Sequence, residues 1–268
     1  MRHLVVHESP VTARPDGTPA GTLVQVWRYP ISSVGGETVQ DAELTSTGVA
    51  GDRDWCLFDP ETGEVAAPEK RKRWRSAPHL QARGGQILEL RLSDGPWLPA
   101  LAPETARALQ GHFGFRVELR PVLGGGDSSG PNAIKPRYQR EPIHLVTTAS
   151  MKRLASLLPG SVIDPRRFRP NLVIDTGEAE EESFLEQAWM GREWSIGAAR
   201  LRVVRPCMRC AFTVIVQPEL ELDPAILAAI AKVGEGAFGV LCSVVQPCQV
   251  QVGDHLVEAA TQGAIAAS

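Results

Sequence analysis

The sequence predicts a mainly β protein with a few helices, an α+β fold. Apolar and polar residues alternate through most of the chain, as they do in strands that bury one face. Glycine and proline, 25 and 21 of the 268 residues, interrupt these runs at short intervals. Helical periodicity is confined to a few short segments. The composition, 43% hydrophobic and 22% charged, is that of an ordinary globular protein.

Short strands account for most of the first half. They are expected at 23–26, 38–39, 42–44 and 55–58, and the stretch "QILELRLSDG" repeats the alternation. Asp59 and Pro60 open a predicted hairpin turn, in which Gly63 takes a positive φ. A short helix is expected over "PETARALQGHFG". We therefore predict an N-terminal β-barrel-like domain over residues 1–122.

Residues 123–142 are rich in glycine, serine and proline, which predicts a loop. A loop of this length is often a lid, so it is a candidate lid, with a plain linker as the alternative. A helix is expected over 147–160, where Thr or Ser caps its start and Pro-Gly ends it. Residues 143–268 form a second domain, which can pack with the first as one unit. Its strands are expected in "RFRPNLVIDTG", "EWSIGAARLRVVRP", "AFTVIVQPE", "FGVLCSVVQP" and "CQVQVGDHLVEAA", with a further helix in "DPAILAAIAKV".

Charge and hydrophobicity exclude some functions. The net charge of −3 and a pI near 6.1 give no basic footprint for nucleic acid. No apolar run approaches the roughly 20 residues that span a bilayer, and the start "MRHLVVHESP" lacks the apolar stretch of a signal peptide. We expect a soluble, cytoplasmic protein without nucleic-acid or membrane partners. Its five cysteines are an odd number, so some are expected to be free thiols.

Two of these cysteines lie in "VVRPCMRCAFTVIV", at the predicted tip of a strand-turn-strand. One interpretation is a redox dithiol, although the β-branched run "AFTVIV" follows instead of the helix that lowers the pKa of the first cysteine. A second is a zinc site, for which Cys242 and Cys248 are a loose match because five residues separate them instead of two. A reactive thiolate at Cys207 or Cys210 is the third interpretation, because Arg205 and Arg209 flank the pair and a neighbouring cation favours a thiolate. The plain alternative is two half-buried cysteines in a turn.

Arginines gather in "DPRRFRPNLVID", where Arg167 and Arg169 precede a predicted strand. Arginine binds phosphate and other oxyanions bidentately. Pro170 is expected to hold Arg169 in an extended conformation and to keep it out of a helix. Asn171 can donate and accept at the mouth of the strand. The plain alternative is a solvated basic turn.

Two further segments offer groups for an anion. "GVAGDRDW" places Arg53 between a glycine-rich turn and a strand. "YPISSVGG" places Ser32 and Ser33 beside two glycines, where hydroxyls and backbone N–H groups make an anion nest. A hairpin loop is the plain alternative for this second segment.

Taken in order, "YPISSVGG", "GVAGDRDW", "RFRPNLVIDTG", "SIGAARLRV", "PCMRC" and "FGVLCSVV…VQVGD" resemble the MOSC-domain family, named for the C-terminal domain of molybdenum-cofactor sulfurase. The arrangement is similar to members that carry an N-terminal MOSC β-barrel domain, including the mitochondrial amidoxime-reducing component and its bacterial relatives. Each motif alone is weak, but the ordered set covers the chain from about Leu23 to Leu256. The resemblance implies a MOSC β-barrel fold preceded by a smaller β-rich domain.

The resemblance also implies roles for individual residues. In the amidoxime-reducing members the second cysteine of the motif ligates molybdenum, and that position is Cys210. Arg169 and Asn171 match residues that contact the pterin, and Arg53 and Ser33 match residues that reach the cofactor. The candidate cofactor-binding set is Ser32, Ser33, Arg53, Arg167, Arg169, Asn171 and Arg209, with Cys207 and Cys210 as candidate catalytic residues and Cys210 as the metal ligand.

The chain departs from the family's pattern in three places. Ser32 stands where those members have a lysine, so Arg28, Arg166 or Arg167 would have to supply the charge. The chain ends after "VEAATQGAIAAS" without the electron-donating domain of some bacterial members, so we expect a separate donor protein. Cys248 stands where glycine is usual; its role, like that of Cys242, is left open.

Two functions follow from the resemblance. The first is a molybdenum-cofactor-binding oxidoreductase that reduces N-hydroxylated or other N-oxygenated small molecules. The second is a sulfurtransferase without the cofactor, in which Cys210 or Cys207 carries a persulfide from a sulfur-donor protein to a metal centre or small acceptor. A weaker third is a cofactor-delivery module. A Cys thiolate suits a soft metal in the first case and a sulfur atom in the second.

Overall fold

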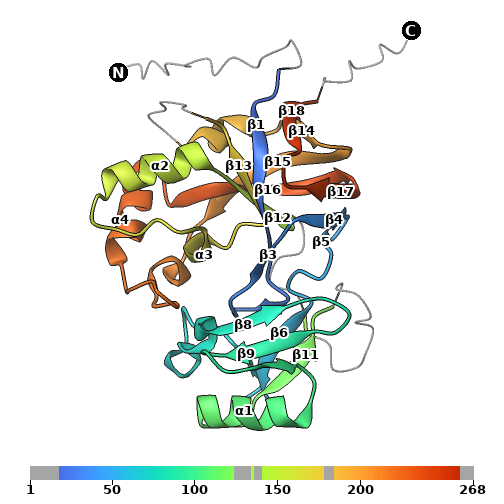
Figure 1. Cartoon of the computed structure of the whole chain (residues 1–268). Coiled ribbons are helices and arrows are strands. Elements are labelled where there is room, and N and C mark those ends of the chain that lie inside the picture. Colours follow the sequence, from blue (N-terminus) through green and yellow to red (C-terminus); the bar gives the residue numbers. More distant parts are fainter. Residues whose placement is uncertain (1–17, 124–133, 136–140, 178–183, 260–268) are drawn as a thin grey trace.

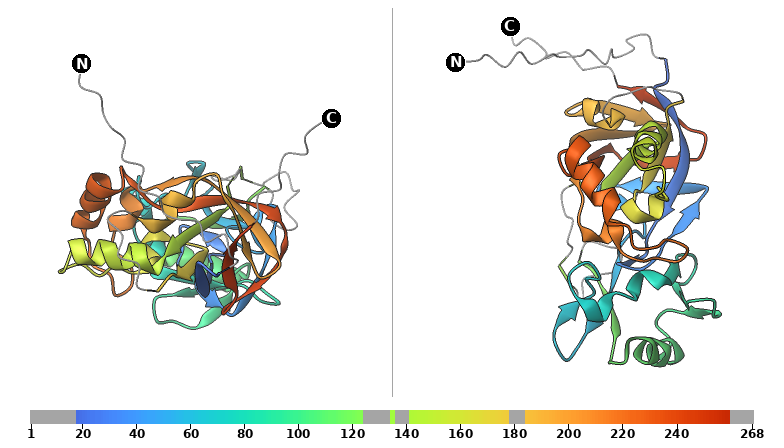
Figure 2. Two further views of the ribbon diagram at one scale, coloured as in Figure 1. Left: turned by 90° about the horizontal axis from the view of Figure 1, so that it is seen from above. Right: turned by 90° about the vertical axis from the view of Figure 1, so that its left-hand side faces the viewer.

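The structure is a computed structural model, and it describes residues 18–123, 134–135, 141–177 and 184–259. Two parts are stacked along its long axis, a barrel and a smaller group of sheets (Figures 1 and 2). Most of the candidate lid at 123–142 lies outside the described residues. The mainly β fold with a few helices is confirmed.

The barrel is closed by seven strands of the described chain. They follow the order β13 (Leu172–Asp175), β12 (Ile143–Thr147), β16 (Ala237–Gln246), β15 (Ala199–Met208), β14 (Glu193–Ile196), β18 (His255–Glu258) and β1 (Gly21–Arg28). Pairing of β1 with β13 closes the ring, and β3 (Glu37–Val39) extends it beyond β1. Alternate residues of these strands fill the interior, which includes Leu23, Leu145, Leu201, Val240 and Leu256.

The first strand pairs across the predicted domain boundary. β1 belongs to residues 1–122, yet it lies between β13 and β18 of the second half. β4 (Asp41–Thr45) likewise pairs with β17 (Cys248–Gln251) and with β5 (Gly48–Val49). The barrel therefore needs both halves of the chain, because neither half supplies a closed ring of hydrogen bonds.

The smaller part lies below the barrel in Figure 1. One sheet joins β11 (Glu118–Pro121), β6 (Trp55–Asp59), β2 (Ile31–Ser32) and β7 (Glu64–Val65), and another joins β8 (Leu80–Arg83), β9 (Glu89–Leu92) and β10 (Trp97–Pro99). The predicted turn at 59–64 is confirmed, and Gly63 has φ +72°. Helix α1 (Pro103–Phe113) and the short helices η1 (Lys72–Trp74) and η2 (Ala77–His79) cover the core, in which Phe113 and Phe115 pack edge-on against buried Trp74.

Three helices cover one side of the barrel (Figures 1 and 2). They are α2 (Thr148–Leu157), α3 (Pro165–Phe168) and α4 (Pro224–Val233), and the short helix η3 (Leu185–Trp189) also packs against β12 and β16. Helix α2 begins as predicted, since the Thr147 side chain accepts a hydrogen bond from the backbone N–H of Ser150. Phe168, Phe184 and Phe238 pack between the helices and the barrel.

Two local predictions are wrong. "AFTVIV" begins as the short helix η4 (Ala211–Val214) and not as a strand, because η4 packs against α3 and α4 with Phe212 and Thr213 buried, and this tertiary packing overrides the β propensity of the run. Arg169 is not extended before Pro170, but takes the left-handed conformation at φ +56° and ends α3. Both differences lie beside the candidate site and determine its shape.

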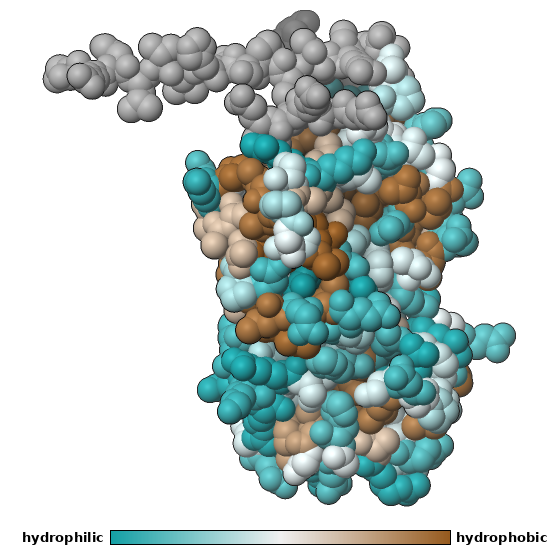
Figure 3. Space-filling view, turned by 60° about the vertical axis from the view of Figure 1, so that its left-hand side comes forward, coloured by the Kyte–Doolittle hydropathy of each residue, from teal (hydrophilic) through white to brown (hydrophobic). Residues whose placement is uncertain are grey.

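No described helix is both long and apolar enough to cross a membrane. Hydrophobic and hydrophilic residues are mixed on the face shown in Figure 3, with the larger brown areas over the barrel half.

Candidate functional site

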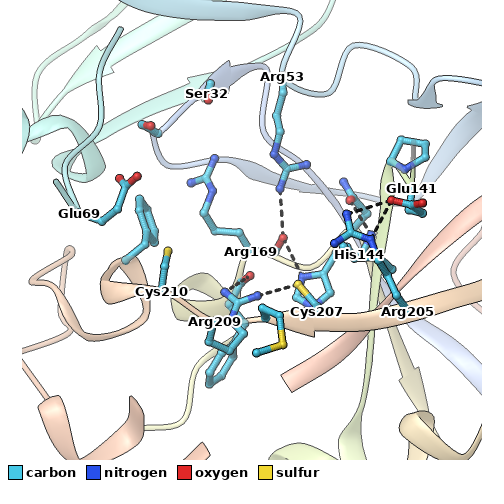
Figure 4. A pocket seen from close by; sticks show the side chains of 17 residues that line it. Ser32, Arg53, Glu69, Glu141, His144, Arg169, Arg205, Cys207, Arg209 and Cys210 are labelled. Carbon is cyan, nitrogen blue, oxygen red and sulfur yellow. Dashed lines mark hydrogen bonds and ion pairs between the residues drawn. The ribbon is translucent and has the colours of Figure 1, made fainter. Parts of the chain in front are cut away.

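A cavity of about 280 Å³ opens where the barrel meets the smaller part of the molecule. Its lining combines residues from both halves of the chain (Figure 4). The cavity therefore brings together segments that lie far apart in the sequence. Eight of the nine predicted site residues line it: Ser32, Ser33, Arg53, Arg169, Asn171, Cys207, Arg209 and Cys210.

The two cysteines have different surroundings. Cys207 lies near the end of β15 and is 9% exposed, whereas Cys210 precedes η4 and is exposed. In Figure 4 Arg169 stands between them. The two thiols share one cavity but not one environment.

Positive groups gather on Cys207 and not on Cys210. The Arg209 guanidinium donates a hydrogen bond to the Cys207 sulfur at 3.1 Å, while Arg205 pairs with Glu141 at 2.9 Å. Burial raises the pKa of the Cys207 thiol, but the charges and hydrogen bonds of His144 and Arg209 outweigh it and lower the pKa from about 9 to about 6. Of the two cysteines offered as a reactive thiolate, Cys207 is therefore the one that a flanking arginine contacts.

His144 is a site residue that the sequence analysis missed. It is buried in β12, and its two ring nitrogens face the carbonyl oxygens of Arg169 at 3.4 Å and Phe238 at 3.2 Å. A Cβ at Gly239, which has φ +77°, would overlap the ring, so glycine leaves room for it. The available signal was a lone polar residue within the apolar run Ile143–Val146.

The left-handed turn at Arg169 organises the cavity. Its carbonyl accepts hydrogen bonds from Arg53 at 3.2 Å and from His144, as the dashed lines in Figure 4 show. Its guanidinium donates to the Val34 carbonyl at 2.6 Å and lies 4.0 Å from the ring centroid of Tyr29. Arg169 therefore ties the barrel to the smaller part with its backbone and its side chain.

The serine turn and Arg53 come from the N-terminal half. Ser33 and Arg53 both have positive φ, +68° and +58°. The Ser33 hydroxyl donates to the Ala66 carbonyl at 3.0 Å, and Arg53 pairs with the adjacent Asp52. Asp52 therefore balances part of the charge that Arg53 brings to the cavity. The Ser33 hydroxyl already donates its proton to a backbone carbonyl, so it can only accept a further hydrogen bond.

Asn171 supports the frame as well as lining the cavity. Its side-chain oxygen accepts from the backbone N–H of His144 at 3.2 Å, and its amide nitrogen donates to the Trp27 carbonyl at 3.4 Å. The residue is fully buried and joins β12 to β1. A loss of this side chain would disturb the strand that carries His144.

Arg167 is a correction to the predicted set. It is 1% exposed and lies outside the cavity, where it donates to the carbonyl oxygens of Val162, Thr213 and Glu221. These bonds hold the turn after η4 and make Arg167 part of the frame. Arg28 and Arg166, the other proposed replacements for the family lysine, pair with acidic residues and do not line the cavity either.

The cavity nevertheless has more basic than acidic side chains. Among its described residues are four arginines (Arg53, Arg169, Arg205 and Arg209) and two glutamates (Glu69 and Glu141). Glu69 and Glu141 were also missed by the sequence analysis, because nothing local marks them. Glu69 lies across the cavity from the barrel, near Cys210 in Figure 4.

The donor set fits a metal that brings most of its own ligands. The described residues contain no group of three or more His, Cys, Asp or Glu side chains able to hold a metal ion. They do present one exposed thiol, Cys210, in an arginine-lined cavity. A dithiolene-bound metal on an anionic pterin needs one soft protein ligand and basic groups for its phosphate. The residues present thus fit such a cofactor, apart from the serine in place of the family lysine.

Comparison with known families agrees with this geometry. The model of the MOSC domain matches residues 105–257, and that of the MOSC N-terminal beta barrel domain matches residues 20–90. The chain belongs to the MOSC-domain family.

The similarity extends to proteins of known name. Molybdenum cofactor sulfurase of Drosophila ananassae is 38% identical over 252 residues, which cover 81% of this chain and 31% of the relative. Molybdenum cofactor sulfurase of Drosophila persimilis is 34% identical over 162 residues, which cover 57% of this chain and 19% of the relative. The chain thus spans a third or less of these sulfurases. Mouse mitochondrial amidoxime-reducing component 1 is 26% identical over 238 residues, covering 73% of this chain and 66% of the relative.

Solved structures show distant similarity. The YuaD protein from Bacillus subtilis matches with a TM-score of 0.46 and 14% identity, over 90% of this chain and 97% of that one. YiiM from Escherichia coli matches with a TM-score of 0.33 and 20% identity, over 45% of this chain and 55% of that one.

Proposed function

We propose that the chain binds a molybdenum cofactor through Cys210 and reduces N-hydroxylated or other N-oxygenated small molecules. The observation that carries the proposal is the exposed Cys210 thiol in an arginine-lined cavity of a MOSC fold. The relative named amidoxime-reducing component supports this reaction class. The electron donor is a separate protein, and the chain acts in the cytoplasm.

The chain's own residues hold and orient the cofactor and supply protons to the substrate. Cys210 offers a thiolate ligand, while Arg53 and Arg169 bind oxyanion groups of the cofactor. When bound, the cofactor supplies a redox-active metal. Removal of an N-hydroxyl oxygen as water consumes two protons, and Cys207, with a pKa of about 6, exchanges protons with solvent near neutral pH. Arg209 and His144 hold this group at the cavity wall.

The test is the metal content of the purified chain. We expect about one molybdenum per wild-type chain, little in Cys210→Ser and the wild-type amount in Cys248→Ser. Cys248 is half-buried on β17 and does not line the cavity, so this variant controls for the loss of any thiol. Equal molybdenum in the two variants would contradict the assignment of the ligand.

The second candidate is a sulfur carrier, and Cys207 favours it. A thiolate held by Arg209 and His144 attacks the outer sulfur of a donor persulfide, and the donor leaves as a thiol after taking up a proton. Mass spectrometry after incubation with a persulfide donor would then show one added sulfur that a reductant removes. The added sulfur should be absent from Cys207→Ser and present in Cys248→Ser.

A further inference from the structure

A second, smaller cavity lies on the other side of Arg169. We call it the rear cavity; its volume is about 30 Å³. It lies where the turn after β1 meets α3 and the turn after η4. Arg169 lines this cavity as well as the main one. The other lining residues are Tyr29, Gly35, Gly36, Pro78, Gln81, Arg166, Gln217 and Pro218.

Two buried polar groups of the rear cavity have no hydrogen-bond partner within the described residues. They are the hydroxyl of Tyr29, which is 1% exposed, and the side-chain nitrogen of Gln217, which is 6% exposed. Each such group costs about 1–3 kcal/mol if it is left unsatisfied. Two of them in one small space indicate a bound group that accepts hydrogen bonds from both.

The chemistry of the lining indicates the sign of the charge that the bound group carries. Burial raises the pKa of Tyr29 above its usual range, so the hydroxyl keeps its proton and donates. The amide N–H₂ of Gln217 and the guanidinium groups also donate. Asp164 and Glu219 pair with Arg166 and do not line the cavity. The lining thus presents donors and positive charge.

The rear cavity has about 30 Å³ against about 280 Å³ for the main cavity, which favours a small occupant. We propose that the rear cavity is a binding site for one halide-sized monovalent anion, held by Tyr29, Gln217 and Arg169. This site shares only Arg169 with the lining of the proposed cofactor site, and its test needs no metal.

One consequence concerns the main cavity. An anion in the rear cavity partly neutralises Arg169, whose guanidinium also faces the main cavity. Chloride is therefore expected to weaken the binding of an oxyanion such as inorganic phosphate in the main cavity, and phosphate to weaken chloride by the same factor.

The first experiment locates the anion. Crystals of the full chain grown in bromide are measured at the bromine absorption edge, where bromide stands in for chloride. We expect an anomalous peak in the rear cavity within hydrogen-bond distance of Tyr29 and Gln217. A rear cavity with a water molecule and no anomalous peak would overturn the proposal.

The second experiment measures binding in solution. Chloride is exchanged for gluconate at constant ionic strength, and the melting temperature is followed. We expect a saturable rise of about 5–10 °C at a hundredfold excess over Kd in the wild type. Tyr29→Phe and Gln217→Met should each lose most of this chloride-dependent rise in melting temperature. If one variant fails to fold, the result for the other tests the site.

The matched control is Gln187→Met. Gln187 is half-buried and donates to the Ala237 carbonyl away from the rear cavity, so this variant should keep the full chloride effect. An equal chloride effect in all variants would show adventitious surface binding only and would reject the site.

Discussion

The end of β15, which carries Cys207, and the turn before η4, which carries Cys210, differ although two residues separate them. Cys207 is buried against His144 and Arg209, and its pKa is lowered to about 6. Cys210 is exposed, and no described arginine donates to its sulfur. One thiol is held by the protein, and the other is presented to the cavity.

The difference teaches how a Cys-x-x-Cys segment can separate two tasks. An open metal ligand needs access, so it belongs on an exposed turn. A group that stores or gives a proton needs a controlled pKa, so it belongs beside fixed charges. The following predictions test whether this separation holds, from the largest expected effect to the smallest.

The first prediction compares the two serine variants. Because Cys210→Ser removes the proposed metal ligand, we expect more than about a 100-fold loss of N-hydroxyl reduction. Cys207→Ser should keep its molybdenum and lose about tenfold, a general-acid-type effect smaller than the loss of the ligand. Steady-state rates and metal content measured on the same samples check this. Equal losses of metal in both variants would remove the distinction between the two thiols.

The second prediction concerns stability against pH. The folded pKa of Cys207, about 6, lies below its ordinary value of about 9, so the thiolate stabilises the fold above pH 9 and this contribution is lost as the pH falls to 6. The free energy of unfolding of the wild type minus that of Cys207→Ser should rise with pH by at most about 1.4 kcal/mol per unit in this window. Urea titrations between pH 6 and 9 measure it. A flat difference would mean that Cys207 is an ordinary thiol.

The third prediction concerns the space that Gly239 leaves for His144. In Gly239→Ala the new Cβ would overlap the ring at a left-handed φ, so we expect a loss of about 2 kcal/mol or more and a higher pKa for Cys207. Gly111→Ala is the control, since nothing lies within 4 Å of its Cβ in helix α1; it should gain about 0.5–1 kcal/mol. Chemical denaturation measures both. If Gly239→Ala keeps the wild-type stability and the wild-type pKa of Cys207, the His144 ring does not depend on the space that Gly239 leaves.

The fourth prediction separates the two flanking arginines. Arg209→Gln removes the cation at 3.1 Å from the Cys207 sulfur and should raise the pKa of Cys207 by about one unit or more. Arg205→Gln should leave it unchanged, because Arg205 pairs with Glu141. The pH dependence of iodoacetamide labelling at Cys207, followed by mass spectrometry, gives both values. A larger shift in Arg205→Gln would reverse the assignment.

Much of the fold could be predicted because it depends on local patterns. The alternation of apolar and polar residues predicted β1, β4 and β6, and the cap at the start of the predicted helix placed α2. The strand predicted over "AFTVIV" was wrong, since η4 packs against α3 and α4 with Phe212 and Thr213 buried, and these tertiary contacts are not visible in a local pattern. The pairing of β1 with strands beyond residue 122 could not be predicted either, because its partners lie more than a hundred residues away in the chain.

The sequence by itself determined the strand pattern, the ordered motifs of the MOSC family and most of the residues that meet at the cavity. Only the tertiary structure decided which thiol Arg209 and His144 contact. It also decided that the Arg167 side chain bonds to backbone carbonyls outside the cavity while the Arg169 side chain lines the cavity. The physical reason is that a side chain's direction depends on single backbone angles, such as φ +56° at Arg169. Contacts with Val34 and Tyr29, more than a hundred residues away in the chain, support that conformation.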